Sequence, residues 1–364
     1  MVVFHVFKEI VVQSHKGEYS TSFIYGAIDK LNENPIKNSI YIIDRNICEL
    51  YGDRINNILS SQRVIKIDAT EENKSLDKMT EYVHELMALK IKRGEKLIAI
   101  GGGIIQDVTC FLSSTVMRGL VWIFYPTTLL AQSDSCIGSK SSINSGEYKN
   151  ILGTFLPPEK VVIDVDFLKT LENREIFSGL GEMIKIHAIS GPEIFNLISD
   201  SYEKILSNLP VMEEFIFNSL SMKKKLIEID EFDQGPRNVL NYGHSFGHAI
   251  ESATNFAIPH GIAVTIGMDI ANFVSAELGV STMNHFNRMH NLLDKNSRTY
   301  RHTYIDIDLL LSALSKDKKN SNKQLKLILP NKSGKIGIGL YENTPNLKKS
   351  IDNYFETYGS SKLQ

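Results

Sequence analysis

Short apolar runs alternate with amphipathic stretches along the first half of the chain. The apolar runs are SIYIIDRN, RVIKIDA, KLIAIGGG, VWIFYPTT and KVVIDV, at 39–46, 63–69, 96–103, 121–128 and 160–165. Each is short, rich in β-branched residues and bounded by polar or turn-forming residues, which is typical of buried strands. Helical spacing over about 73–94 separates the second run from the third. This alternation predicts a Rossmann-like α/β domain with a parallel sheet and crossover helices.

From about residue 176 onward the apolar spacing becomes helical. The helical segments are GLGEMIKIHAIS at 179–190, a long stretch near 193–230, the histidine-containing segment from 237, and HGIAVTIGMDIANFVSAELG at 260–279. A chain of 364 residues is too long for one ordinary hydrophobic core. We therefore predict an α/β nucleotide-binding domain over 1–175 and a mainly α-helical domain over 176–364.

Polar residues recur at helical spacing within RNVLNYGHSFGHAIESATNFAIPH, at 237–260. Arg237, Asn241, His244 and His248 are separated by four, three and four positions, so one α-helix would align them in a single polar stripe. A solvated face would normally contain Lys and Glu, and 238–250 contain neither. A buried hydrogen-bonded histidine and a chance HxxxH are the other bland alternatives. Because Arg237 and Asn241 share the predicted face, the pattern favours a metal or anion site.

Three glycines follow the strand KLIAI, in GGGIIQD. Glycines between a buried strand and a helix let backbone amides approach a pyrophosphate. The pattern is not GxGxxG, so this turn alone is weak evidence for a dinucleotide. Asp44, at the end of SIYIID, could accept ribose hydroxyls or could simply cap a helix.

Charged and amide side chains also gather in predicted loops rich in glycine and serine. They are Arg118, Asp134, Lys140, Lys149 and Asn150, followed in the second half by the i,i+3 pair Glu182 and Lys185. Such side chains could converge on a small anion, although a solvated basic loop and a surface ion pair are the simpler alternatives.

Composition excludes several classes of protein. The chain is 42% hydrophobic and 23% charged with a formal net charge of -2, which is ordinary for a globular protein and provides no electrostatic basis for binding nucleic acid or an anionic membrane. Strand-like apolar pairs occur near the N-terminus, but no run has the length of a signal sequence or a membrane span, so we expect a cytoplasmic protein. Cys48, Cys110 and Cys136 form no CxxC, and we expect them to be reduced.

Several motifs together resemble a known family. GGGIIQD, MRG, PTTLLAQSDS, the Lys140–Asn150 segment, GLGEMIK and RNVLNYGHSFGHAIE followed by PHG have the order and spacing of the 3-dehydroquinate synthases, within the wider sugar phosphate cyclases. The resemblance covers roughly 40–335. It implies a homodimeric lyase that uses NAD and a divalent metal, zinc or cobalt. The implied reaction converts 3-deoxy-D-arabino-heptulosonate 7-phosphate to 3-dehydroquinate and phosphate.

The resemblance also assigns residues. The implied metal ligands are Glu182, His244 and His260, while His248 moves to the phosphate with Lys140 and Asn150. The implied NAD contacts are Asp44, Glu71, Lys74, Gly102, Gly103, Asp107, Thr127, Thr128, Asp134, Ser135 and Thr170, with Lys140 and Lys149. The remaining polar residues are Lys149, Lys185, Lys223, Arg237, Asn241 and either Lys318 or Lys319, with Arg118 supplied across a dimer interface. Of these, Arg237 and Lys223 would bind the substrate carboxylate.

The chain departs from the family pattern at Gln106, Ser139, Ser141 and Tyr148, where glycine or another residue is usual. These departures leave open a relative that makes 2-deoxy-scyllo-inosose or a valiolone-type cyclitol, although such enzymes typically lack the equivalents of Arg237 and Asn241. A metal-dependent alcohol dehydrogenase is a further alternative, because it combines a glycine turn with a metal site in a helical half. A binding protein without activity is disfavoured by the complete set of ligands.

Overall fold

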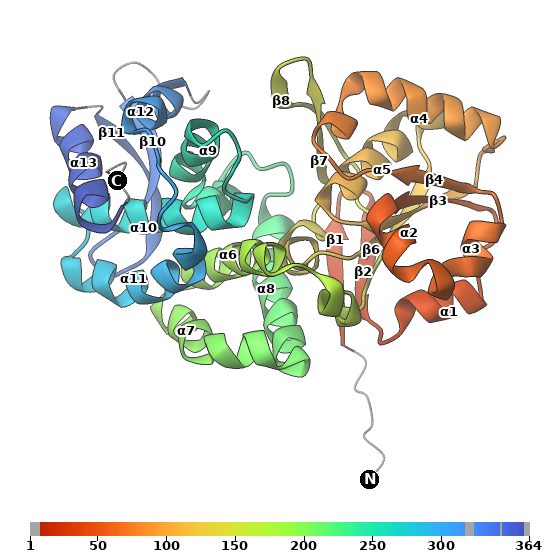
Figure 1. The fold of residues 1–364 in the computed structure, drawn as a ribbon, viewed down its shortest axis with the longest axis horizontal. Helices are drawn as coiled ribbons and strands as arrows, with labels where there is room; N and C mark the ends of the chain where they lie inside the picture. Colours follow the sequence, from red (N-terminus) through yellow and green to blue (C-terminus); the bar gives the residue numbers. More distant parts are fainter. Residues whose placement is uncertain (1–7, 317–323, 343, 360–364) are drawn as a thin grey trace, which may run out of the picture. The chain divides into compact units, whose positions relative to one another are not determined.

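The computed structural model describes residues 8–316, 324–342 and 344–359. The chain divides into two compact units (Figure 1), one made of Met1–Leu171 with Ile216–Asp233 and the other of Glu172–Phe215 with Gln234–Gln364. The first stretch of this unit thus ends four residues before the predicted boundary. The unit also includes Ile216–Asp233, which the prediction placed in the second domain. As a statement about independent domains, the division into 1–175 and 176–364 stays a prediction.

A seven-stranded sheet in the order β1-β2-β9-β6-β5-β3-β4 forms the first unit. Its strands are β1 (Glu9–Ser14), β2 (Gly17–Phe23), β3 (Ser39–Asp44), β4 (Val64–Ile67), β5 (Lys96–Gly101), β6 (Val121–Pro126) and β9 (Lys160–Ile163). All neighbouring strands run parallel except the edge hairpin β1–β2. The five strands predicted from the apolar runs are therefore present, and the parallel sheet is confirmed.

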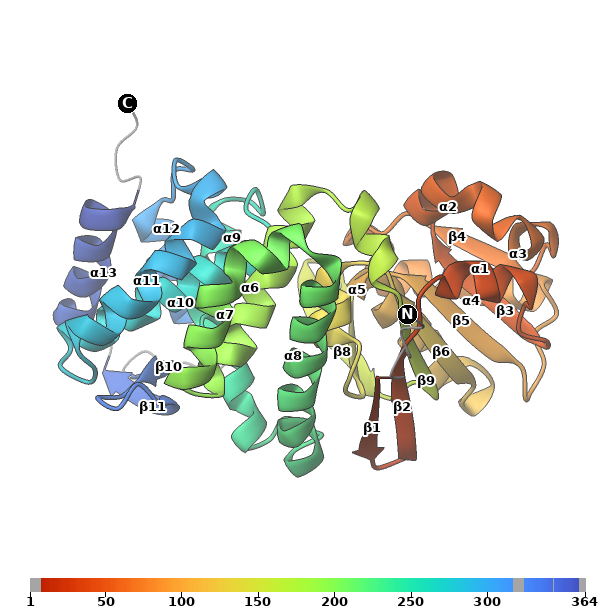
Figure 2. The same cartoon turned by 90° about the horizontal axis from the view of Figure 1, so that it is seen from below.

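Helices cover both faces of this sheet (Figure 2). Side chains alternate along a strand, so Tyr41 and Ile43 of β3 join a core with α1 (Ala27–Glu33), α2 (Arg45–Tyr51) and α3 (Asn56–Ser60). The intervening Ile40 and Ile42 are equally buried. On that side the sheet packs against α5 (Gly103–Thr115). Burial on both faces explains why these strands are continuous apolar runs.

The helix predicted over 73–94 is shorter in the structure. A 3₁₀ turn (Glu72–Lys74) leads into α4 (Leu76–Ala88), and the chain then reverses through Lys90, whose φ is 55°. A left-handed residue cannot continue an α-helix, so the prediction of helix beyond this residue is wrong.

The three cysteines are free thiols. Cys110 and Cys136 are buried, and Cys48 is half-buried.

The second unit is mainly helical, as predicted. Its helices are α6 (Asn173–Ile189), α7 (Pro192–Ser207), the first turns of α8 (Leu209–Ile229), α9 (His244–Ala253), α10 (His260–Glu277), α11 (Met283–Ser297), α12 (Ile307–Lys316) and α13 (Pro345–Tyr358). The stretch predicted as helical near 193–230 is thus two helices, α7 and α8. None of the helices in the described ranges is long and apolar enough to cross a membrane.

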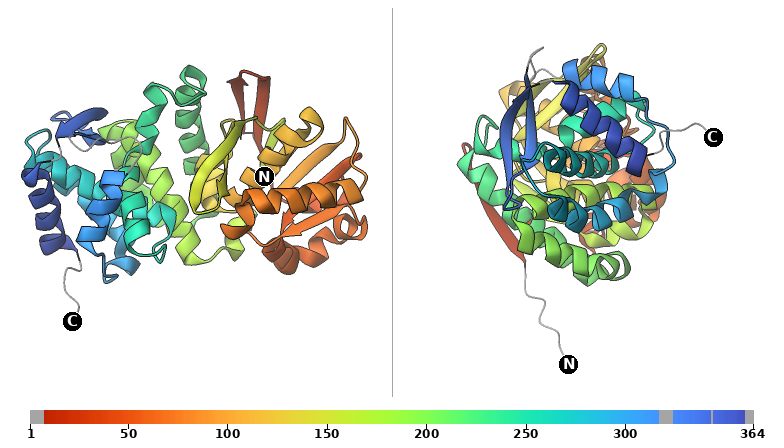
Figure 3. Two further views of the ribbon diagram at one scale, coloured as in Figure 1. Left: turned by 90° about the horizontal axis from the view of Figure 1, so that it is seen from above. Right: turned by 90° about the vertical axis from the view of Figure 1, so that its left-hand side faces the viewer.

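Helix α10 is the centre of the second unit. It contacts α6, α9, α11 and α13. It also contacts the hairpin formed by β10 (Gln324–Pro330) and β11 (Ile336–Glu342), and this hairpin is blue in Figure 3. Nearly every residue from Gly261 to Ser275 is buried. A helix buried on nearly all sides has to be surrounded by other elements, and this explains why apolar residues occur on every face of HGIAVTIGMDIANFVSAELG. The polar residues among them, Thr265, Asp269, Asn272 and Ser275, are buried as well.

A buried histidine makes the second unit sensitive to acid. His187, near the end of α6, is 2% exposed and packs against Phe215, and its Nδ1 lies 2.7 Å from the carbonyl oxygen of Met183. Burial disfavours the imidazolium and lowers the pKa of His187 to about 4. The unfolded chain therefore binds a proton more readily than the folded chain, and stability is lost as the pH falls from about 6.5 towards 4.

We predict that His187→Gln flattens this acid loss. The pKa difference corresponds to about 3 kcal/mol of unfolding free energy between pH 6.5 and 4. Chemical denaturation at several pH values should show the free-energy gap between wild type and variant closing as the pH falls. His84→Gln, at an exposed position on α4, is the control and should parallel the wild type. A constant gap across this range would contradict the assignment.

Candidate active site

Three helices of the second unit approach so closely that only glycine fits between them. A Cβ added to Gly181 of α6 would lie 2.0 Å from the carbonyl oxygen of Gly261 in α10. A Cβ added to Gly267 of α10 would lie 2.1 Å from the carbonyl oxygen of Gly243, directly before α9. Both distances are far inside van der Waals contact, so side chains at these positions would push the helices apart.

The glycines stand next to the polar residues of the candidate site. Glu182 follows Gly181, His260 precedes Gly261, and His244 follows Gly243. Glu182 Oε1 lies 3.2 Å from His260 Nε2 and 3.6 Å from His244 Nε2. The close helix crossings therefore bring a carboxylate and two imidazoles, distant in sequence, to one point.

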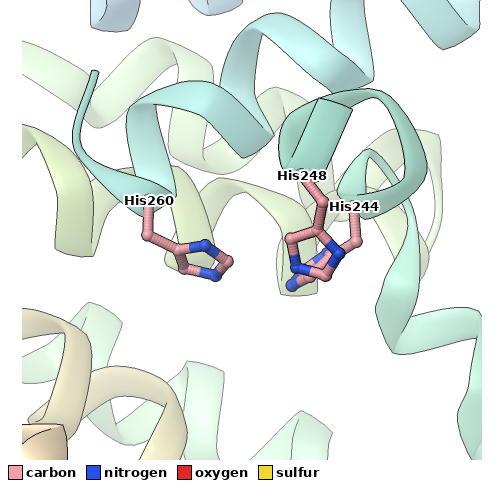
Figure 4. A group of neighbouring side chains, drawn as sticks. All are labelled: His244, His248 and His260. Atoms are coloured by element: carbon pink, nitrogen blue, oxygen red, sulfur yellow. The ribbon is translucent and has the colours of Figure 1, made fainter. Parts of the chain in front are cut away.

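A third imidazole joins this group. One ring nitrogen from each of His244, His248 and His260 lies within 4.8 Å of the others. Figure 4 shows the rings of His244 and His248 side by side on α9, with His260 facing them from the start of α10. Two overlapping sets of three side chains could therefore hold a metal ion, and both sets contain His244 and His260. The third ligand is Glu182 in one set and His248 in the other.

The electrostatics of the cluster favour an ionised carboxylate. Burial opposes charge on Glu182, but the ammonium of Lys185, which pairs with its Oε2, and the neighbouring His244 and His260 hold its pKa well below the usual range. Burial, followed by the charge of Lys185, lowers the pKa of His244 well below its usual value, so this ring is neutral. A neutral imidazole and a carboxylate are the forms that bind a cation.

His260 differs from His244 because two carboxylates face it. Burial works against its protonation, but contacts with Glu182 and with Glu251, whose Oε1 lies 3.3 Å from Nδ1, raise the pKa of His260 to about 10. In the absence of a cation this ring carries a proton at neutral pH. Binding a metal through His260 Nε2 then requires release of that proton.

Arg237 and Asn241 do not share a helix with the histidines, so the predicted single stripe is wrong. They lie in a 3₁₀ turn (Pro236–Asn241), and α9 begins only at His244. The break is at Gly243, whose φ of 78° and close contact with α10 suit only glycine. Arg237 is 7% exposed, and Asn241 Nδ2 donates to the carbonyl of Asn238 at 3.1 Å.

In the first unit, several residues assigned to NAD lie at the carboxyl ends of neighbouring parallel strands. Asp44 ends β3, Gly102 follows β5 and Thr127 follows β6. A Cβ on Gly102 would lie 2.9 Å from the Thr128 side chain, so glycine permits close packing here. Asp44 also caps α2 by accepting from the backbone N–H of Asn46 at 3.0 Å. Ligands of parallel α/β sheets bind at this edge, and its geometry suits a dinucleotide.

A polar network extends from this edge into a hairpin that the sequence did not predict. The hairpin, β7 (Lys140–Ser145) and β8 (Tyr148–Phe155), turns through Gly146 at φ 56°. Lys74 Nζ lies 3.1 Å from Asp107 Oδ2 and donates to Asn150 Oδ1 at 3.0 Å. Asp107 Oδ1 in turn accepts from the backbone N–H of Ser142 at 3.0 Å. The Ser-Gly dipeptide between two polar strands is the signal that could have indicated this hairpin.

Asn144 is a member of this network that sequence reasoning missed. Its Nδ2 donates to Glu71 Oε2 at 2.9 Å, and its Oδ1 accepts from the N–H of Asn150 at 2.9 Å. Asn150 itself has a φ of 51°, a conformation that asparagine tolerates better than most residues. Asn144 therefore connects Glu71 with Asn150, both of which the sequence had assigned to the site.

The remaining assigned residues have diverse positions. Lys140 Nζ lies 2.9 Å from Asp233 Oδ2, Lys223 Nζ lies 2.5 Å from Asp134 Oδ1, and Thr170 Oγ1 lies 2.8 Å from the hydroxyl of Tyr51. Lys149 is exposed on β8, and Arg118 is exposed at φ 68°. Gly103 is the first residue of α5. Lys318 and Lys319 lie outside the described residues.

Sequence comparisons identify the family. Models of the 3-dehydroquinate synthase N-terminal and C-terminal parts match residues 64–178 and 179–320. The 3-dehydroquinate synthase of Helicobacter pylori (strain P12) is 38% identical over 288 residues, which cover 79% of this chain and 81% of that protein. The chain belongs to the 3-dehydroquinate synthase family.

Solved structures share the fold of this 3-dehydroquinate synthase family member. A 2-deoxy-scyllo-inosose synthase complexed with carbaglucose-6-phosphate, NAD+ and Co2+ has a TM-score of 0.82 at 21% identity, covering 95% of this chain and 100% of that one. ValA, a 2-epi-5-epi-valiolone synthase from Streptomyces hygroscopicus subsp. jinggangensis 5008 with NAD+ and Zn2+ bound, has a TM-score of 0.79 at 24% identity, covering 93% and 96%. At these identities the likeness shows the fold alone.

The four departures from the family pattern have different surroundings. Gln106 exchanges two hydrogen bonds with Ser135. Ser139 is 1% exposed, and the hydroxyl of Ser141 lies 2.9 Å from that of Thr154. Tyr148, in contrast, is 69% exposed at the start of β8. Three departures are therefore packed inside the first unit, and one faces solvent.

We predict that Gly181→Ala disrupts the helix crossing. The new methyl would overlap the Gly261 carbonyl, so α6 and α10 must separate, at a cost of about 3 kcal/mol or more. The melting temperature should fall by several degrees, and the affinity of the cluster for Zn²⁺ should fall with it in a titration. Gly337→Ala is the matched control, because it is exposed and nothing lies within 4 Å of an added Cβ. Equal stability of the two variants would show that the helices do not touch at Gly181.

Proposed function

We propose that this chain is a 3-dehydroquinate synthase that uses NAD and a divalent metal, zinc or cobalt. The observation that supports this most directly is the cluster of Glu182, His244 and His260 at glycine-lined helix crossings, in a chain of this family. The reaction is a carbon–oxygen lyase reaction that converts 3-deoxy-D-arabino-heptulosonate 7-phosphate to 3-dehydroquinate and phosphate. Two imidazoles and a carboxylate leave coordination positions open for substrate oxygens, as catalytic metal sites require.

The two bound groups supply distinct chemistry. When bound, the metal would supply a Lewis acid for substrate hydroxyls, and NAD would supply a hydride acceptor that is recycled and not consumed. Glu182, His244 and His260 hold the metal in this proposal. Asp44, Glu71, Asp107 and the glycines after β5 hold the cofactor.

The residues of the chain mainly bind and orient charge. Lys185 keeps Glu182 ionised, because its ammonium pairs with one oxygen and leaves the other facing the imidazoles. Lys140, Asn150 and His248 bind the phosphate in this proposal. Arg237 and Lys223 bind the carboxylate, and Arg237 is the better suited because its planar guanidinium can make two parallel hydrogen bonds. Such fixed cations stabilise charge that develops during phosphate loss.

We also propose a homodimer in which Arg118 reaches the phosphate of the partner's site. Arg118 is exposed, and both it and the preceding Met117 have left-handed backbones, at φ 68° and 52°, so the guanidinium is accessible to a second copy of the chain. The cytoplasmic location stays a prediction.

Metal content of purified variants tests which set binds the metal. We predict that His260→Ala and Glu182→Gln lose bound zinc, whereas His248→Asn retains zinc and loses phosphate release. NAD binding and circular dichroism establish that each variant is folded. His84→Gln is the control for loss of a surface histidine. Loss of zinc in His248→Asn with retention in Glu182→Gln would assign the metal to the three histidines instead.

Phosphate release tests the substrate. With zinc and catalytic NAD, we predict turnover of 3-deoxy-D-arabino-heptulosonate 7-phosphate and not of sedoheptulose 7-phosphate or glucose 6-phosphate. Arg237→Met should lower kcat/KM about 100-fold or more, because it removes a charged partner of the carboxylate. Arg174→Met, at an exposed position on α6, should leave kcat/KM unchanged. Turnover of a neutral sugar phosphate would indicate a specialised cyclase, and a net rise in absorbance at 340 nm would indicate a dehydrogenase.

A further inference from the structure

Two residues assigned to the cofactor lie in a helical turn of unusual form. Residues Ala131–Ser135 are a π-helical turn, closed by a hydrogen bond from the N–H of Cys136 to the carbonyl of Ala131 at 3.0 Å. The turn contains Asp134 and Ser135. π-Turns are less stable than α-helix, are rare, and often mark functional sites. A turn of this kind needs contacts elsewhere to hold it.

Gln106 provides such contacts from the first turns of α5. Its Nε2 donates to the carbonyl of Ser135 at 2.7 Å, and its Oε1 accepts from the Ser135 hydroxyl at 2.6 Å. Gln106 is buried, with 6% of the residue exposed. Ser135 ends the turn, where a helix leaves carbonyl groups without intrahelical partners, and Gln106 satisfies this one. A glycine at position 106, common in the resembled family, could make neither hydrogen bond.

Lys223, in α8, binds the adjacent residue of the turn. Its ammonium lies 2.5 Å from Asp134 Oδ1 and donates to the Asp134 carbonyl at 2.6 Å. The segment of α8 that contains Lys223 belongs to the first unit together with α5 and the turn. Successive residues of one turn are thus bound by two different helices. Relaxation of the turn to regular α-helix would shift its register by one residue and rotate the following side chains by about 100°.

We propose that Gln106 is a positioning residue for cofactor binding, which keeps Asp134 and Ser135 in the orientation that NAD requires. This inference rests on the proposed function, because it takes the cofactor to be NAD. Gln106 acts through the turn and does not itself contact the cofactor. A chain with glycine at this position has to hold the same turn by other contacts.

The test compares NAD affinity with stability in matched variants. Gln106→Met keeps the volume of the side chain and removes both hydrogen bonds. We expect its Kd for NAD to rise about five- to tenfold, as loss of neutral hydrogen bonds in a preorganised site predicts. The KM for NAD should rise in parallel, while kcat at saturating NAD stays near the wild-type value. A merely structural role would lower the melting temperature and leave this KM unchanged.

Two further variants make the test specific. In a Ser135→Ala background, the effect of Gln106→Met on the Kd should shrink, because one of the two hydrogen bonds is already absent. Ser114→Ala removes a hydroxyl of the same helix that donates to the Phe111 carbonyl at 2.8 Å. This variant should bind NAD as the wild type does. Wild-type affinity in Gln106→Met, or fully additive effects in the double variant, would overturn the inference. Failure of the wild-type protein to bind NAD would instead overturn the proposed cofactor, and this inference with it.

Discussion

The candidate metal site formed by Glu182, His244 and His260 depends on the near contact of three helix backbones. α6, α9 and α10 meet at Gly181, Gly243, Gly261 and Gly267, where a single methyl group would overlap a carbonyl oxygen. Ordinary helix packing keeps axes about 8–10 Å apart, and side chains fill the space between them. Here the helices come closer, so the side chains next to the glycines reach one another. Glu182, His244 and His260 are neighbours for this reason.

Paired charges are the second organising feature. Four of the lysines assigned to cofactor or substrate have an acidic partner: Lys74 with Asp107, Lys140 with Asp233, Lys185 with Glu182, and Lys223 with Asp134. The pairing reduces the cost of burying Lys74, Lys185 and Lys223, all at most 7% exposed in their side chains. It also holds each ammonium in a defined place. An arriving phosphate or carboxylate has to compete with these acids, which favours ligands that contact several lysines together.

The sequence predicted the central strands of the first unit but not its hairpins. Five buried strands were recognisable because a parallel strand covered on both faces is a continuous apolar run. The hairpins β1–β2 and β7–β8 were not placed, since β8 is exposed along most of its length and lacks apolar alternation. The polar stripe on 237–248 was also wrong in form. Spacing assumes one continuous helix, and the left-handed Gly243 interrupts it.

The sequence by itself determined the fold class, the order of the strands along the chain, the family and the types of residue available for chemistry. These follow from local patterns, because hydrophobic period and motif spacing are properties of neighbouring residues. Only the tertiary structure decided which residues meet. Glu182 lies 62 positions before His244 in the chain, yet the two side chains are 3.6 Å apart. The pairing of Gln106 with Ser135 likewise spans 29 positions. Such contacts depend on how closely distant helices pack, and the local pattern of a single sequence does not show this.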